Sequence, residues 1–132
     1  MTCRILLDHD CEGYAVFLTA GWQETSWHHI LAVEFIRLRD LGLPDNSSDR
    51  DLWRRCQADR LLLITHNRNR DDTTSLQATI ERENTADSLP VITIPRVERL
   101  ALADYRQRVA HRLAEIIIDL ENYLGVGRVF IP

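Results

Sequence analysis

A short, uninterrupted apolar run, Leu61–Ile64, constrains the fold of this chain more strongly than its other segments. The run ends at Thr65 and is followed at once by a polar, arginine-bearing segment, His66–Asp72. A bounded apolar run without polar alternation is typical of a strand buried on both faces, which belongs to a parallel sheet covered by helices. Ligands of such sheets bind outside the carboxyl ends of the strands. We therefore expect the functional site beside the loop that begins at Thr65.

The rest of the sequence alternates between strand-like and helix-like patterns. Apolar runs predict three further strands, at residues 4–7, 91–94 and 128–131. Apolar residues spaced three or four apart, with capping and stop signals around them, predict helices over about residues 10–19, 28–41, 49–58, 75–83 and 102–124. Gly21 is expected just beyond the end of the first helix, and residues 22–27 fit either a short strand or a loop.

This alternation predicts an α/β fold, a three-layer α/β/α sandwich around a mostly parallel central sheet. The chain has 132 residues and shows no internal boundary, so we expect a single domain over residues 1–132. Right-handed crossovers between parallel strands would then fix which helices cover which face of the sheet.

Composition excludes several classes of function. All sixteen basic residues are arginine, and the absence of lysine excludes P-loop ATPases, Schiff-base enzymes and receiver domains. No Gly-x-Gly-x-x-Gly motif supports a dinucleotide site. The net charge of −4 argues against a large non-specific nucleic-acid surface, although it permits a local basic patch.

Cysteine usage and hydropathy bear on the compartment. The three cysteines, Cys3, Cys11 and Cys56, lack metal-ligand spacing, so we expect reduced thiols and a cytoplasmic protein. No apolar stretch approaches the roughly 18 residues of a membrane span, so no membrane association is expected.

Acidic residues that are far apart in the sequence are expected to meet at one edge of the sheet. Asp8 and Asp10 follow the first strand. The helix that begins at Asp49 leads into the strand at residues 61–65, so it runs antiparallel to that strand and starts level with its carboxyl end. Asp51 lies in the same first turn, and Ser48 is its predicted cap.

Several carboxylates at one edge repel each other, which proteins tolerate through a bound cation or raised pKa values. Oxygen ligands without cysteine or histidine spacing favour Mg²⁺ or Mn²⁺, which activates water and stabilises charge on a phosphodiester oxygen. Arg68 and Arg70 would hold flanking phosphates. In the structural alternative, the acids only favour helix starts, and Asp71 and Asp72 are plain turn residues.

A histidine-based metal site is a lesser alternative. His28 and His29 are adjacent and would point in different directions on a helix, although they could assemble with His9 and His66 in three dimensions. Surface or capping roles are the alternative for each of these histidines.

Three short motifs carry a family resemblance. They are LLD at the end of the first strand, SSDRDLW at a helix start, and LLLITHNRNRDD at the central strand and its loop. Over roughly residues 4–95 the chain resembles the PIN-like family, most closely its small bacterial branch found beside toxin–antitoxin modules. The resemblance implies a compact α/β/α fold and a Mg²⁺- or Mn²⁺-dependent ribonuclease, with acids from several loops holding the metal.

Position by position, the resemblance implies that Asp8 and Asp49 are the metal carboxylates, with Asp10 or Asp51 assisting. Glu34, on the predicted second helix, is a loose match to the family's helical acid.

The chain departs from the family after the central strand. The family pattern there is Thr-x-Asp-x-Asp, whereas this chain reads Thr65-His66-Asn67-Arg68-Asn69. Thr65 and Asn67 would position water or metal, but an asparagine is neutral, holds the ion less strongly and does not act as a general base. Asp71 or Asp72 would substitute if the loop is rearranged.

Two functions therefore remain open at the level of sequence. One is a metal-dependent endoribonuclease, and the other is a catalytically inactive PIN-like module that binds RNA or a protein partner. The long helix at residues 102–124 adds a third expectation, because Ile116, Ile117 and Ile118 cover more of its circumference than one sheet face uses. A homodimer seam along this helix is one explanation, and burial under the C-terminal strand is the other.

Overall fold

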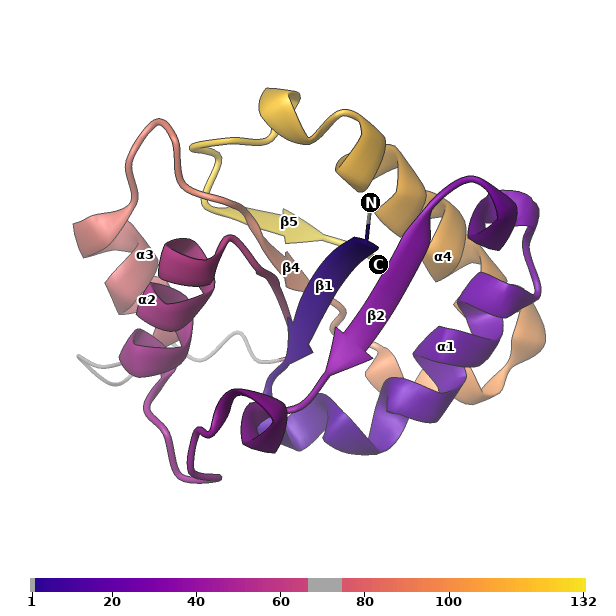
Figure 1. The fold of residues 1–132 in the computed structure, drawn as a ribbon, viewed down its shortest axis with the longest axis horizontal. Coiled ribbons are helices and arrows are strands. Elements are labelled where there is room, and N and C mark those ends of the chain that lie inside the picture. The colour runs from indigo at the N-terminus through magenta and orange to yellow at the C-terminus, as the bar shows by residue number, and fades with distance from the viewer. Residues whose placement is uncertain (1, 67–74) are drawn as a thin grey trace.

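The computed structural model describes residues 2–66 and 75–132, and the strands of these residues form one all-parallel sheet (Figure 1). The strand order is β2-β1-β3-β4-β5. The strands are β1 (Thr2–Leu7), β2 (Ala32–Ile36), β3 (Leu62–Thr65), β4 (Val91–Thr93) and β5 (Arg128–Phe130).

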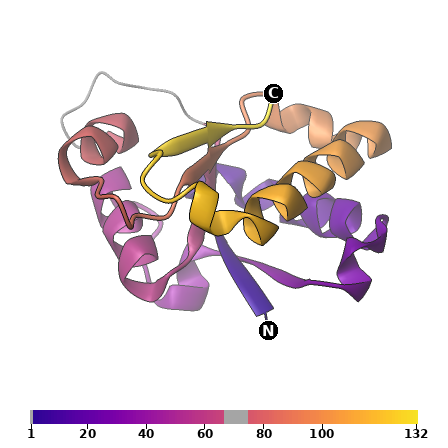
Figure 2. The same ribbon diagram turned by 90° about the horizontal axis from the view of Figure 1, so that it is seen from above.

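Helices cover both faces of this sheet and make it the middle of three layers, which confirms the predicted α/β/α sandwich (Figures 1 and 2). In the described parts of the chain the α-helices are α1 (Ala15–Gln23), α2 (Asp49–Asp59), α3 (Leu76–Glu83) and α4 (Ala103–Ile118). Short 3₁₀ helices connect them: η1 (His9–Tyr14), η2 (Ser26–His29), η3 (Leu38–Leu41), η4 (Val97–Ala101) and η5 (Leu120–Asn122).

The alternation of side chains along β1 shows how the two cores are divided. Ile5 and Leu7 point into the core under α1 and α4, whereas Leu6 points into the core under α2 and α3. All three are fully buried, and burial of such a side chain stabilises a fold by about 1.5–3 kcal/mol. The central strands are therefore apolar on both faces, as the run Leu61–Ile64 predicts.

The last crossover departs from the handedness rule. The first three crossovers share one hand. From β1 the chain moves to β2 at one end of the sheet, and α1 covers one face. From β2 to β3 and on to β4 the chain moves toward the other end of the sheet, and α2 and α3 cover the other face. The step from β4 to β5 continues in that direction, yet α4 packs on the face of α1, so this crossover has the opposite hand. A uniform hand would have placed α4 beside α2 and α3.

The predicted helix over residues 28–41 is wrong, because its centre is the strand β2. Val33 and Phe35 pack against the core while Glu34 between them is exposed, which is strand alternation. The spacing of Leu31, Phe35 and Leu38 also fits a helix, but pairing with β1 supplies a backbone ladder that decides the outcome. Glu34 therefore lies on an edge strand and not on a helix.

Two helix ends also differ from the prediction. The first helix starts as the 3₁₀ helix η1 and continues as α1 to Gln23, so Gly21 lies inside it. A Cβ at Gly21 would stand 2.6 Å from the backbone oxygen of Arg106, so glycine here allows α1 to approach α4 closely. Residues 22–27, left open by the sequence, are the end of α1 and the start of η2.

The predicted long helix is shorter than expected, since α4 ends at Ile118 and the short helix η5 follows. Ile116 is fully buried and Ile117 packs against the core, whereas Ile118 is 57% exposed. The homodimer along this helix stays a prediction. None of the helices within the described ranges has the length and apolar character needed to cross a membrane.

Candidate functional site

Asp8 lies where β1 ends, at the carboxyl edge of the sheet. Its backbone N–H donates to the oxygen of Ile64 at 3.0 Å, which continues the pairing with β3. Its Oδ2 accepts a hydrogen bond from the hydroxyl of Thr65 at 3.0 Å. Thr65 is fully buried, so this bond fixes the carboxylate against the end of the central strand. The structure therefore brings together Asp8 and Thr65, two of the predicted site residues.

Asp49 occupies the first turn of α2 at the same edge. The helix begins as predicted, because the Ser48 side chain accepts from the backbone N–H of Asp51 at 3.1 Å. The Asp49 carboxylate accepts from the N–H of Leu76, the first residue of α3, also at 3.1 Å. This side chain therefore joins two helix N-termini, whose unpaired N–H groups and dipoles favour negative charge.

At this edge the charges of Asp8 and Asp10 act on Asp49, and the charge of Asp10 also acts on Asp8. Burial is the main cause that raises the pKa of Asp8 above its usual range, and the charge of Asp10 raises it further, while the Thr65 hydrogen bond opposes both. Burial also raises the pKa of Asp49, followed by the charges of Asp8 and Asp10, while the hydrogen bond from Leu76 lowers it. The structure thus brings together acids that sequence reasoning placed at one edge.

The other predicted residues have different surroundings. Asp10 is exposed on η1, and Asp51 is exposed on α2, where its charge acts on Arg54. His66 follows β3, and its charge acts on Asp8. Several predicted site residues lie outside the described residues: Asn67, Arg68, Asn69, Arg70, Asp71 and Asp72.

A second group of polar residues, the His9 cluster, lies near this edge and was not predicted. His9 Nδ1 is 2.8 Å from Glu12 Oε1 and 3.7 Å from Asp45 Oδ1. The ligand atoms of these three residues lie within 4.8 Å of one another, so the cluster has the geometry to hold a metal ion. In the described residues this is the one group of three or more with that geometry, and it does not include Asp8 or Asp49.

The His9 cluster is exposed and already carries internal contacts. The hydrogen bond to Glu12, the largest effect, and then the charge of Asp45 raise the pKa of His9. Glu12 also accepts the backbone N–H of Leu38 at 3.2 Å. The spacing of His9 and Glu12 could have drawn notice, but nothing in the sequence places Asp45 beside them.

The other histidines do not join that cluster. His28 and His29 lie on η2 with ring centroids 3.9 Å apart, and Nδ1 of His28 is 2.6 Å from the oxygen of Thr25. In the residues that the structure describes, His28 and His29 belong to no group of three or more ligands that could hold a metal ion.

Arg128 brings a positive charge to the edge, which the sequence did not single out. Its Nη1 donates to the hydroxyl of Thr93 at 2.6 Å, and its Nε donates to Gln77 at 3.2 Å. Its charge lowers the pKa of Asp49 and so opposes the effect of burial. The edge therefore combines half-buried carboxylates with one guanidinium that partly balances them.

The cysteines do not provide a nucleophile. All three are free thiols, and Cys11 and Cys56 are buried. Burial raises the pKa of both buried thiols to about 12, so they stay protonated near neutral pH.

The fold and the edge define a class: an α/β protein with an all-parallel sheet and an acidic carboxyl edge. Comparison with protein-family models, curated proteins and solved structures gives no match to this chain. The PIN-like resemblance of its motifs therefore stays a prediction.

Proposed function

We propose that this chain is a PIN-like, divalent-cation-dependent ribonuclease whose cation is held at the carboxyl edge of the sheet. One observation carries the proposal: Asp8 and Asp49, which are distant in sequence, lie close enough for the charge of Asp8 to raise the pKa of Asp49. Two half-buried acids in this relation favour a bound cation, which would neutralise both.

The donor set fits a hard cation. Asp8 and Asp49 supply carboxylate oxygens, and Asp10 adds a nearby negative charge. Both proposed ligands are therefore oxygen donors. Such ligands suit Mg²⁺ or Mn²⁺. When bound, the cation supplies Lewis-acid stabilisation of a phosphodiester oxygen and lowers the pKa of a bound water.

The protein's own residues hold this arrangement in place. The hydroxyl of Thr65 orients the carboxylate of Asp8, and the N–H of Leu76 orients that of Asp49. Each carboxylate is therefore held on a rigid element, a condition for precise ligation. Asn67, Arg68 and Arg70 follow Thr65 in the sequence, outside the described residues, and keep their proposed roles toward water, metal and phosphate.

The test is a titration with Mn²⁺ of the wild type and of Asp8→Asn, Asp49→Asn and Asp87→Asn. Asp87 is a matched control, because it is an exposed acid in the turn that precedes β4, at the opposite edge of the sheet. We expect Mn²⁺ to raise the Tm of the wild type and of Asp87→Asn and to leave the other two variants unchanged. Cleavage of a labelled single-stranded RNA should fall by at least ~100-fold in those two variants.

The opposite outcome is also informative. If Mn²⁺ shifts neither Tm nor cleavage, the enzyme proposal fails, and RNA binding without cleavage would support the inactive binding module instead. If the Tm shift persists in Asp8→Asn and Asp49→Asn but disappears in His9→Ala, the cation binds at the His9 cluster.

A further inference from the structure

Arginines without acidic partners gather where η4 leads into α4. Arg96, Arg99 and Arg108 are exposed, and in the described parts of the chain none of them has a carboxylate within ion-pair distance. By contrast, Arg106 on the same helix pairs with Glu24 at 2.6 Å. Since the chain carries a net charge of −4, this group is a local basic patch on an acidic protein.

These arginines line two adjoining pockets, which we call the arginine pockets. The first, of about 410 Å³, is lined by Arg99, Arg108 and the first turn of α4 at 102–105. The second, of about 480 Å³, is lined by Arg96, Arg112 and Pro132, and again by Arg108. Arg108 lines both pockets, so they adjoin at this residue, and Arg112 in the second pocket also pairs with Glu115 at 3.3 Å.

Tyr105, which lines the first pocket, has a buried hydroxyl. Tyr105 is only 4% exposed, and its hydroxyl has no hydrogen-bond partner among the described residues. The guanidinium of Arg108 lies 5.2 Å from the centre of its ring. Burial is the main cause that raises the pKa of the phenol; the charges of Arg108, Arg96 and Arg99 lower it, and that of Glu98 raises it. An unpartnered donor among cationic groups is suited to an oxyanion.

The start of α4 adds backbone donors to the same pocket. Leu102, the N-cap, provides no side-chain cap, so the first N–H groups of this 16-residue helix have no capping acceptor. An anion at a helix N-terminus accepts from such groups and is favoured by the helix dipole. Asp104 also lines this pocket, so one carboxylate stands against the guanidiniums of Arg99 and Arg108.

The arginine pockets lie on the side of the molecule that carries the acidic edge. Helix η4 contacts η1, the segment that follows Asp8 and carries Asp10. Figure 2 shows η4 and the start of α4 on the side toward which the strands run. The arginine pockets and the segment that follows Asp8 therefore lie close together on one side of the molecule.

We propose that the arginine pockets bind successive phosphates of a single-stranded polynucleotide and lead its backbone to the acidic edge. This inference rests on the proposed function and adds the path of the substrate. Two adjoining pockets with a shared arginine fit consecutive phosphates of one strand better than a single isolated anion.

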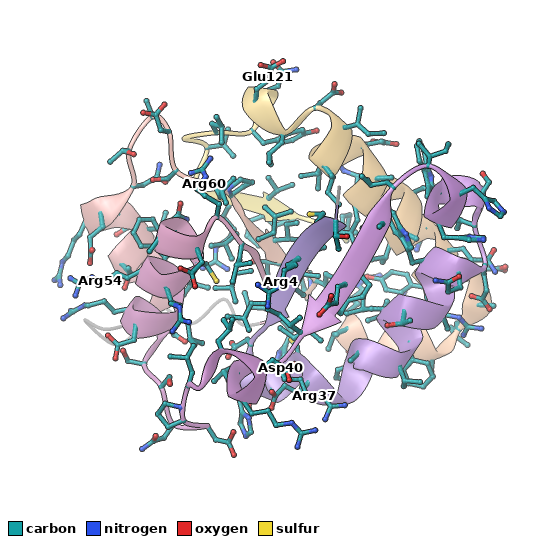
Figure 3. The ribbon with its side chains drawn as sticks, in the orientation of Figure 1. Arg4, Arg37, Asp40, Arg54, Arg60 and Glu121 are labelled. Atoms are coloured by element: carbon teal, nitrogen blue, oxygen red, sulfur yellow. The ribbon has the colours of Figure 1, made fainter. Side chains whose placement is uncertain are left out.

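The test measures RNA binding in EDTA, where cleavage does not interfere. The probe is a fluorescein-labelled single-stranded RNA of about ten nucleotides, followed by anisotropy. The double variant Arg99→Gln/Arg108→Gln is compared with Arg4→Gln/Arg60→Gln, which loses the same charge from exposed arginines elsewhere (Figure 3). We expect about tenfold weaker RNA binding in Arg99→Gln/Arg108→Gln and no such loss in Arg4→Gln/Arg60→Gln. In the first variant the slope of log binding constant against log salt concentration should also become shallower by roughly 1.4, or about 0.7 for each lost phosphate contact.

Tyr105→Phe provides a second measurement, because it removes a hydroxyl that bonds to no described residue. We expect an unchanged Tm and a roughly threefold loss of RNA affinity, a small effect because one neutral donor is removed. A loss of affinity without loss of stability supports a ligand contact, which a merely structural role would not produce.

Other outcomes separate the explanations. Equal weakening in the two arginine variants would overturn the proposal, since binding would then reflect net charge. If inorganic phosphate displaces the RNA and binds as tightly as the RNA does, the pockets take a single small phosphate, and the polynucleotide path is wrong. Asp8→Asn should bind RNA in EDTA like the wild type, so a failure of the cation proposal does not affect this result.

Discussion

Two groups of acidic residues lie near the same end of the molecule, and they differ in burial. The ligand atoms of the His9 cluster lie within 4.8 Å of one another, but its residues are mostly exposed and already paired. Asp8 and Asp49 form no such tight group among the described residues, yet burial and the charge of Asp8 raise the pKa of Asp49. Short distances in the exposed cluster reflect an ion pair that is already formed, whereas burial disfavours the charged forms of Asp8 and Asp49.

Under the proposed function, desolvation of the carboxylates marks the cation site, and proximity of ligand atoms does not. A proton on His9 makes the imidazole positive, which neutralises the charge of Glu12, and it competes with a metal ion for the same ring nitrogen. The raised pKa of His9 favours this protonated form. At Asp8 and Asp49 the opposing charges are weaker than the effect of burial: the charge of His66 lowers the pKa of Asp8 and that of Arg128 lowers the pKa of Asp49, yet both pKa values stay raised. A cation should therefore gain more by binding between Asp8 and Asp49 than at the His9 cluster.

The largest expected effect is a difference in cation affinity between variants of the two groups. Asp49→Asn should weaken Mn²⁺ binding at pH 7 by at least about tenfold, because it removes a charged ligand. His9→Ala should change the affinity by less than about twofold, because it removes no proposed ligand. Isothermal titration calorimetry on both variants measures the two constants side by side. A larger loss of Mn²⁺ affinity in His9→Ala would contradict the proposal that the cation binds between Asp8 and Asp49.

The contrast also shows how far sequence reasoning reaches into a site. Asp8 and Asp49 were predicted because each sits at the end of an element whose direction the alternation of strands and helices fixes. The His9 cluster depends on where the linker that carries Asp45 folds back, and the sequence contains no local signal for that contact. Arg128 was not predicted as a site residue for the same reason, since its side chain reaches Thr93 on the neighbouring strand.

The fold follows the same division between local and long-range information. The strand Leu62–Thr65 and the Ser48 cap were predicted because their signals are contained in a few residues. The strand β2 was not predicted because its apolar residues fit the spacing of a helix as well as that of a strand, and only pairing with β1 decides between the two. The opposite hand of the crossover through α4 also depends on packing, since α4 and α1 meet closely at Gly21.

A smaller effect concerns stability without a cation. Because folding raises the pKa of Asp49 above its usual value of 3.8, the folded state binds protons more tightly. The free energy of unfolding therefore decreases as the pH rises from 3.8 through the folded pKa. Asp49→Asn should remove this loss and raise the free energy of unfolding at pH 7 by about 0.5–1 kcal/mol. This value lies at the low end of the gains that single stabilising substitutions give, because the carboxyl is partly exposed to solvent.

Urea unfolding in EDTA between pH 4 and pH 7 measures this difference. The gain should shrink toward the acidic end, where the wild-type carboxyl is protonated as well. Asp87→Asn serves as the control and should show no such trend. A lower stability of Asp49→Asn at pH 7 would mean that the hydrogen bond to Leu76 outweighs the repulsion from Asp8.

The smallest expected effect is at His9 and appears at higher pH. Because the bond to Glu12 raises the pKa of His9 above 6.5, its contribution to stability is complete below 6.5 and disappears as the pH rises through the folded pKa. In Glu12→Gln the pKa of His9 should move down toward 6.5, which the imidazole resonances report in an NMR titration. Since this side chain is exposed, the Tm of the variant should stay close to that of the wild type. An unchanged pKa of His9 would show that Asp45 or Asp10 holds its proton instead, and the His9 cluster would then differ from the Asp8–Asp49 pair in charge as well as in burial.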